Sequence, residues 1–195
     1  MMKRWMAGTL LTVSLCATWK LVAAAAFPFY VFRGFQAPEN HYAPSGWMGD
    51  TRDIGFNDRH KTPEISHSII RVSYAAKAAQ GNGWAGMYWQ YPANNWGSRS
   101  GGFNLNGAKS LVFMARGDKG GEIVSQFKLG GIEEAYADSG SAVLGPVTLT
   151  KEWKRYEINL EGQELSSISG GFCWVMNRDD NPTGAVFYLD DIRYE

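Results

Sequence analysis

The chain has 195 residues, of which 45% are hydrophobic, 19% charged and 14% aromatic. This length fits one domain, and the composition is too apolar for a disordered chain and too mixed for a multi-span membrane protein. Basic and acidic residues balance at 19 each, so no overall positive field is available to hold a nucleic acid. The two cysteines cannot build the framework of a disulfide-rich miniprotein.

The N-terminus has the pattern of an export signal. Two basic residues precede an apolar stretch over residues 5–26, which ends in four alanines that suit a signal peptidase. We therefore expect cleavage near Ala26 and a secreted, periplasmic or cell-envelope protein whose mature chain lacks a membrane span. One alternative is an uncleaved membrane anchor, which Lys20 within the stretch disfavours. Another is a lipoprotein acylated at Cys16, for which the preceding Leu15 is a poor match.

Removal of residues 1–26 changes the charge and the cysteine chemistry of the chain. The segment carries three basic residues and no acidic one, so the mature chain is mildly acidic. Cys173 is then the only cysteine, which excludes an internal disulfide. A lone thiol of this kind is expected to be buried and inert.

Alternating apolar and polar residues recur along the mature chain, whereas helical periodicity does not. Segments rich in Gly, Asn, Asp and Pro separate the alternating runs, as expected for turns. Seven or more short strands with such turns predict an all-β chain that forms an antiparallel β-sandwich in one domain, residues 27–195. The runs with the clearest alternation are 69–74, 84–91, 110–116, 122–129, 154–160, 172–176 and 185–194.

Four segments carry a resemblance to a known family. They are 111–117, the pattern W-x-x-Y-x-I-x-L over 153–160, Gly-Gly-Phe at 170–172, and Phe-Tyr-Leu-Asp-Asp-Ile at 187–192. Their order and spacing resemble the galactose-binding-like jelly rolls, especially the β-sandwich carbohydrate-binding modules attached to bacterial polysaccharide hydrolases. The resemblance spans residues 65–195. It implies a jelly roll of two sheets that binds sugar without chemistry, on its concave sheet or in loops at one end.

The same resemblance implies a structural Ca²⁺ near the chain termini. Family members often hold this ion with an aspartate just before the end of the last strand, a position that matches Asp190. A hard cation needs several oxygen ligands at once. Glu39 and Asn40 from the early loop, together with backbone carbonyls, are therefore expected to complete the shell. The alternative is that Asp190 and Asp191 are a solvated strand end.

The strongest functional signal is the segment 84–96, in which aromatic residues alternate with uncharged amides. A pyranose has apolar C–H faces and hydroxyl edges, which an aromatic ring flanked by hydrogen-bonding groups matches. The wholly apolar face of this strand is expected in the core, and its mixed face is expected to be exposed and to bind sugar. Trp96 and Trp47, beside glycines in loops, are further candidate ring platforms. The core face comprises Ala85, Met87, Trp89 and Tyr91, and the binding face comprises Trp84, Tyr88 and Gln90.

Polar groups from other segments are expected to complete this surface. If neighbouring strands pair in register, Arg116, Gln126 and Lys128 lie on the same sheet surface as the aromatic residues and hydrogen-bond the sugar hydroxyls. Asn177 and Arg178 belong to a loop that reaches the rim of this surface. The alternative is that the tryptophans belong to the core, as they commonly do in sandwiches, and that Arg116 is a surface charge.

The sequence does not favour an enzyme. Glycoside hydrolysis needs two carboxyl groups across the scissile bond, whereas the adjacent pair Glu133 and Glu134 would point to opposite faces of a strand. The three histidines lack metal-ligand spacing, and no nucleophile elbow or P-loop is present. The main interpretation is an exported module that binds a polysaccharide or oligosaccharide, alone or beside a separate glycan-active enzyme. The alternatives are a structural or protein-binding jelly roll of the cell envelope and a small secreted polysaccharide lyase or hydrolase.

Overall fold

A computed structural model describes residues 23–195, and most of the predicted export signal, residues 1–22, lies outside the described residues. The described chain contains thirteen strands, a single 3₁₀ turn, η1 (Thr51–Asp53), and no α-helix. The strands are β1 (Phe29–Phe32), β2 (Ala43–Gly49), β3 (Ile54–Thr62), β4 (Ile65–Tyr74), β5 (Trp84–Gln90), β6 (Ser110–Gly117), β7 (Ile123–Val124), β8 (Gln126–Gly130), β9 (Ser141–Leu144), β10 (Val147–Thr148), β11 (Lys154–Asn159), β12 (Gly170–Asn177) and β13 (Ala185–Tyr194).

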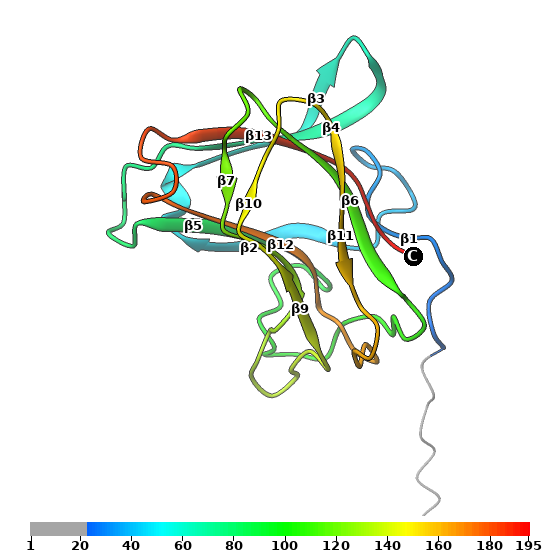
Figure 1. Cartoon of the computed structure of the whole chain (residues 1–195). Coiled ribbons are helices and arrows are strands. Elements are labelled where there is room, and N and C mark those ends of the chain that lie inside the picture. The colour runs from blue at the N-terminus through cyan, green and yellow to red at the C-terminus, as the bar shows by residue number, and fades with distance from the viewer. Residues whose placement is uncertain (1–22) are drawn as a thin grey trace, which may run out of the picture.

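The strands form two large sheets that face each other (Figure 1). The six-stranded sheet has the order β11-β6-β13-β4-β3, and β1 pairs with β13 beside this path. The five-stranded sheet has the order β2-β5-β12-β8-β9, and β7 with β10 makes a separate two-stranded ribbon. Every strand pair in the described chain is antiparallel. The architecture is therefore the predicted antiparallel β-sandwich.

Local sequence explains how the strands divide their side chains between core and surface. In β11, Tyr156 and Ile158 are buried while the charged residues between and before them are exposed, which is the pattern of a strand with one wet face. In contrast, β12 is buried along most of its length. The opposing sheet covers its inner face, and its outer face is buried as far as Cys173, whereas Val175 and Asn177 on that face are only partly buried.

The core lies between the two sheets and is rich in aromatic rings. Phe113 of β6 meets Phe127 of β8 with ring centroids 4.6 Å apart. Trp174 of β12 meets Phe187 of β13 edge to face at 5.4 Å. These pairs join opposite sheets and are fully or almost fully buried, so they hold the layers together by apolar burial and by favourable ring geometry.

Six of the seven predicted runs each correspond to one strand, whereas the run 122–129 is divided into β7 and β8, which pair in different sheets. The strands within residues 29–62 and 141–148 were not predicted. In β2, Pro44 and two glycines obscure the alternation, since these residues are uncommon in strands. Cys173 is buried, as expected, and desolvation raises the pKa of its thiol. Among residues 23–195, no helix has the length and apolar character needed to cross a membrane.

Candidate functional site

Side chains on the outer face of the five-stranded sheet form rows, because neighbouring strands pair in register. Ala85, Met87 and Trp89 of β5 belong to the core cluster, so the alternate residues of β5 point outward. The outward residues from Trp84 to Tyr88 make three rows, which are Trp84 with Asn177; Met48, Gly86, Val175 and Gln126; and Gly46, Tyr88, Cys173, Lys128 and Val143. Gln90 lies beyond these rows and pairs with Ala43 and Gly170.

The end of this face around Trp84 is open. Trp84 is 37% exposed. Its indole lies beside Gly49, where a Cβ would come within 3.0 Å of the ring, and Gly49 has a φ of 66° that favours glycine. The adjacent floor is apolar, because Met48 and Val175 both approach Gly86 from their own strands. The result is an exposed ring beside a shallow apolar strip.

Asp50 holds the backbone at Trp84 and in the preceding loop in place through hydrogen bonds. Its backbone N–H donates to the Trp84 carbonyl at 2.8 Å. Its carboxylate accepts the N–H groups of Gln80 at 2.8 Å, Asn82 at 3.1 Å and Gly83 at 2.6 Å. Burial acts to raise the pKa of Asp50, but these hydrogen bonds outweigh it and the pKa is lowered. The ionised carboxylate therefore holds the loop that precedes Trp84.

The end around Tyr88 is closed, so the prediction that Tyr88 and Gln90 are exposed is wrong. Tyr88 is only 2% exposed, and its hydroxyl donates to the Gly130 carbonyl at 2.8 Å. Gln90 has no exposed surface, donates to the Asn95 carbonyl at 3.0 Å and accepts from the Ser45 hydroxyl at 3.0 Å. Two loops, residues 91–101 and 131–140, cover these side chains. Neither residue offers a ring or an amide to solvent.

The covering loops carry exposed aromatic rings of their own. Trp96 is 38% exposed and meets the Tyr88 ring edge to face at 5.8 Å. Tyr136 is 50% exposed, and its backbone N–H donates to the Gly97 carbonyl at 2.9 Å, so the two loops lie together. Figure 1 shows them on the outer side of the five-stranded sheet. Tyr136 lies in a loop and was not predicted as a site residue, because no strand alternation marks it.

Four of the predicted polar residues lie where they were expected. Gln126 and Lys128 project from β8 on the outer face, and the Lys128 amine lies 5.0 Å from the Tyr88 ring centroid. Asn177 pairs with Trp84 at the end of β12, and the Arg178 N–H donates to the Gly83 carbonyl at 2.8 Å. Gln126, Asn177 and Arg178 therefore border the open end of the face, whereas Lys128 lies in the Tyr88 row beside the closed end.

Arg116 and Trp47 do not share this face, which corrects their predicted placement. Arg116 belongs to β6 of the other sheet, where its guanidinium lies 4.0 Å from the centroid of the Tyr188 ring. Trp47 belongs to β2 rather than to a loop, and it packs edge to face on Phe56 of β3 at 6.0 Å. Alternation within a strand cannot tell which sheet receives the strand, so the error for Arg116 was one of sheet assignment.

Tyr91 was expected in the core, but it is 44% exposed. The strand β5 ends at Gln90, so the alternation that keeps Trp89 inside does not extend to the next inward position. The Tyr91 ring instead packs on Phe103, with ring centroids 4.3 Å apart.

The residues predicted to hold calcium do not form a shell. The Asp190 carboxylate is bonded to His67, with Nε2 at 2.9 Å and 3.1 Å from its two oxygens. Glu39 pairs with the Arg33 guanidinium at 3.1 Å, and Asn40 accepts the Arg33 N–H at 2.9 Å. Asp190 is buried, so it is not a solvated strand end either, and burial raises its pKa despite the His67 bond.

No group of three or more His, Cys, Asp or Glu side chains gathers to hold a metal among residues 23–195. As placed, the three predicted ligands do not fit Ca²⁺, which needs several oxygens free at once. Calcium binding itself stays a prediction, which metal analysis of the purified protein tests.

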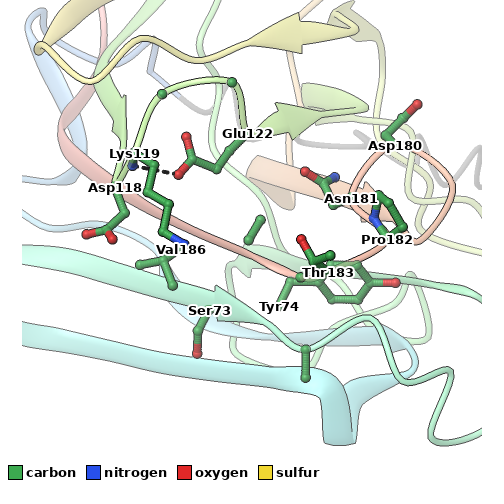
Figure 2. Close-up of a pocket in the computed structure, with 15 residues that line it drawn as sticks. Ser73, Tyr74, Asp118, Lys119, Glu122, Asp180, Asn181, Pro182, Thr183 and Val186 are labelled. Carbon is green, nitrogen blue, oxygen red and sulfur yellow. Dashed lines mark hydrogen bonds between the residues drawn. The ribbon is translucent and has the colours of Figure 1, made fainter.

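An end-loop pocket of about 410 Å³ offers a second possible location for a ligand (Figure 2). Its lining is built from residues 73–75, 118–122 and 180–186. Several of its polar groups are used internally. Glu122 accepts the Lys119 N–H at 2.8 Å, and the Asn181 amide bonds to both backbone groups of Ile123. Its one aromatic lining residue, Tyr74, is buried, so the pocket presents no ring on which a sugar could stack.

Solved structures with a similar architecture identify the fold. The family 30 carbohydrate-binding module of the cellulosomal cellulase Cel9D-Cel44B from Clostridium thermocellum matches with a TM-score of 0.56 and 15% identity, over 87% of this chain and 98% of that chain. The family 11 module of the cellulase Lic26A-Cel5E from the same organism matches with a TM-score of 0.51 and 13% identity, over 89% and 94%. This chain has the fold of a carbohydrate-binding module.

The predicted jelly-roll sandwich is thereby confirmed, and at these identities the likeness concerns the carbohydrate-binding-module fold alone. No family model matches the sequence, and comparison with curated proteins finds no match either.

Proposed function

We propose that the chain binds a polysaccharide non-covalently on the outer face of its five-stranded sheet. The observation that carries the proposal is the presence of two exposed indoles, Trp84 and Trp96, on this one face. Exposed tryptophan rings are costly to leave in water and match the apolar face of a sugar ring. The fold shared with carbohydrate-binding modules supports the same proposal.

Polar side chains beside the indoles supply the hydrogen bonds that a neutral sugar needs. Gln126 is exposed on β8, and Lys128 is partly exposed one row nearer the closed end. Asn177 and Arg178 border the Trp84 end. Amides both donate and accept, so they suit hydroxyl groups. The apolar strip between Trp84 and Trp96 would take the faces of intervening sugar rings.

The proposal is one of binding without catalysis. None of the side chains in the three outward rows is a carboxylate, whereas glycoside hydrolysis uses a pair of them. Glu133 and Glu134 lie exposed in the loop over the closed end and not across the open strip. A module that binds and does not cleave fits this face.

We further infer that residues 1–26 direct export, which would bring the chain to polysaccharides outside the cytoplasm. The alanines at the end of this segment support the inference. A separate glycan-active enzyme is a fitting partner, because a module that holds a polysaccharide can keep such an enzyme near its substrate.

The test is a screen of the purified protein against a panel of neutral polysaccharides and oligosaccharides, by array and by affinity electrophoresis, with calcium and with chelator. We expect a group of hits that share one backbone linkage, and no change in the polymer on incubation. Release of shorter products would indicate an enzyme. Silence from well-folded protein would favour the structural role in the cell envelope.

A further inference from the structure

A pocket of about 490 Å³ lies on the other side of the molecule from the proposed sugar face. It forms between the loop that follows β1 and the β3–β4 hairpin, which projects from the body of the sandwich in Figure 1. Four of its lining side chains are basic or can become so, and none is acidic. These four are Arg33, Arg59, Lys61 and His67.

Two of these cations have no acidic partner. Among residues 23–195, neither Arg59 nor Lys61 forms an ion pair, whereas Arg33 pairs with Glu39 and His67 bonds to Asp190. The Arg59 guanidinium lies 3.8 Å from the Phe35 ring centroid, a stacked position that holds its planar group in place. The pocket therefore keeps two positive charges that the chain itself does not neutralise.

The wall opposite the hairpin is fixed. The Phe35 N–H donates to the Ser68 hydroxyl at 2.6 Å. Asn40 closes the same loop by bonding to backbone groups of Arg33 and Gly34. Because the chain's own groups make these contacts, binding would not have to order the loop, and little affinity would be lost to that cost.

We propose that this pocket binds an acidic polysaccharide through a carboxylate or sulfate group held between Arg59 and Lys61. Arginine presents a planar fork to such oxyanions and lysine a compact charge, so the pair suits one recessed anionic group. An anionic membrane is a poorer fit, since the adjoining depression carries Glu39, Asp190 and Asp191, which a negative surface would have to approach.

The experiment measures binding of the full chain to polygalacturonate, with fully methyl-esterified polygalacturonate as the matched neutral form of the same backbone. Dextran sulfate and dextran form a second matched pair. We expect binding to at least one charged member and to neither neutral member at this site. The double variant Arg59→Gln with Lys61→Gln should weaken this binding by about tenfold, without lowering the melting temperature, because both side chains are exposed.

A double variant of equal charge change, Lys77→Gln with Lys151→Gln, is the control, since both lysines are exposed outside the pocket lining. Equal loss in both double variants would overturn the proposal by showing unspecific attraction. The proposal would also be overturned if the protein bound neither charged polymer, or if it bound only phosphatidylglycerol vesicles. Trp84→Ala should leave this binding unchanged, so this site can fail or succeed independently of the proposed sugar face.

Discussion

The two ends of one sheet face differ in what they can offer a ligand. Around Trp84 the outer face is open, with an exposed indole, an apolar strip and amides at its border. Around Tyr88 the same face is closed, because loops 91–101 and 131–140 cover the outward side chains. Both ends belong to one strand, β5, with unbroken alternation.

This difference shows that an outward position in a strand need not be exposed. Alternation decides which side of the sheet a side chain takes, whereas loops decide whether solvent reaches it. The Tyr88 hydroxyl bonds to the end of β8 and the Gln90 amide bonds to the loop at Asn95, so these polar groups stabilise the closed end. The Trp84 indole forms no hydrogen bond within residues 23–195, and its exposed ring is accessible to a ligand.

The largest effect is expected from Tyr88→Ala. Removing this buried ring should destabilise the protein by about 3–5 kcal/mol, as large-to-small substitutions of buried aromatic residues do. Chemical denaturation monitored by tryptophan fluorescence measures this. Tyr88→Phe is the matched control and should cost about 1 kcal/mol for one lost hydrogen bond. If Tyr88→Phe abolished sugar binding while stability stayed constant, the closed end would be part of the site.

In contrast, Trp84→Ala should lower the affinity for polysaccharide and leave the stability of the fold unchanged. Loss of one stacking indole is expected to weaken polysaccharide binding by about 10- to 100-fold, in line with the cost of about 2 kcal/mol for truncating a tryptophan at the centre of a binding surface. The fold should persist because the ring is partly exposed at the sheet end. Isothermal titration with the best ligand from the panel, alongside a thermal melt, checks both parts. Unchanged affinity would remove Trp84 from the site.

Gln126→Ala should give a smaller loss of affinity. The amide lies exposed in the row next to Trp84, and one hydrogen bond is worth about 0.5–1.5 kcal/mol, so a loss of about two- to tenfold is expected. The same titration measures it, with melting temperature as the control for folding. A loss larger than that of Trp84→Ala would shift the centre of the site towards β8.

Arg116→Ala should leave polysaccharide affinity unchanged, because Arg116 belongs to the six-stranded sheet and its guanidinium stacks there on Tyr188. This variant separates the structural account from the sequence-based one, which placed Arg116 beside the aromatic residues. A clear loss of affinity at constant stability would show that the six-stranded sheet takes part in binding.

Sequence patterns predicted the fold class because alternation and turn residues are local features. The run 154–160 is an example, since Tyr156 and Ile158 are buried as its pattern indicates. Strand β2 was not predicted because Pro44 and two glycines interrupt its alternating pattern. Neither the pairing of β6 with β13 nor the pairing of β5 with β12 is local, so the separation of Arg116 from the aromatic face could not be read from the sequence.

The candidate site was predictable in part for the same reason. Trp84, Gln126 and Lys128 lie on one face because their strands belong to the same sheet and their register places these outward positions in line. Tyr136 is held beside the loop of Trp96 by a contact between two loops, which no periodicity encodes. Burial of Tyr88 is likewise non-local, since the Gly130 carbonyl at the end of β8 that accepts its hydroxyl lies 42 positions along the chain.

The most direct test is backbone NMR of the ¹⁵N-labelled protein, titrated with an oligosaccharide of the best ligand. The account predicts that amide shifts concentrate at Trp84, Gly86, Val175 and Gln126, with smaller shifts around Trp96. Shifts confined to residues 118–122 and 180–186 would place the ligand in the end-loop pocket of Figure 2 and contradict the account.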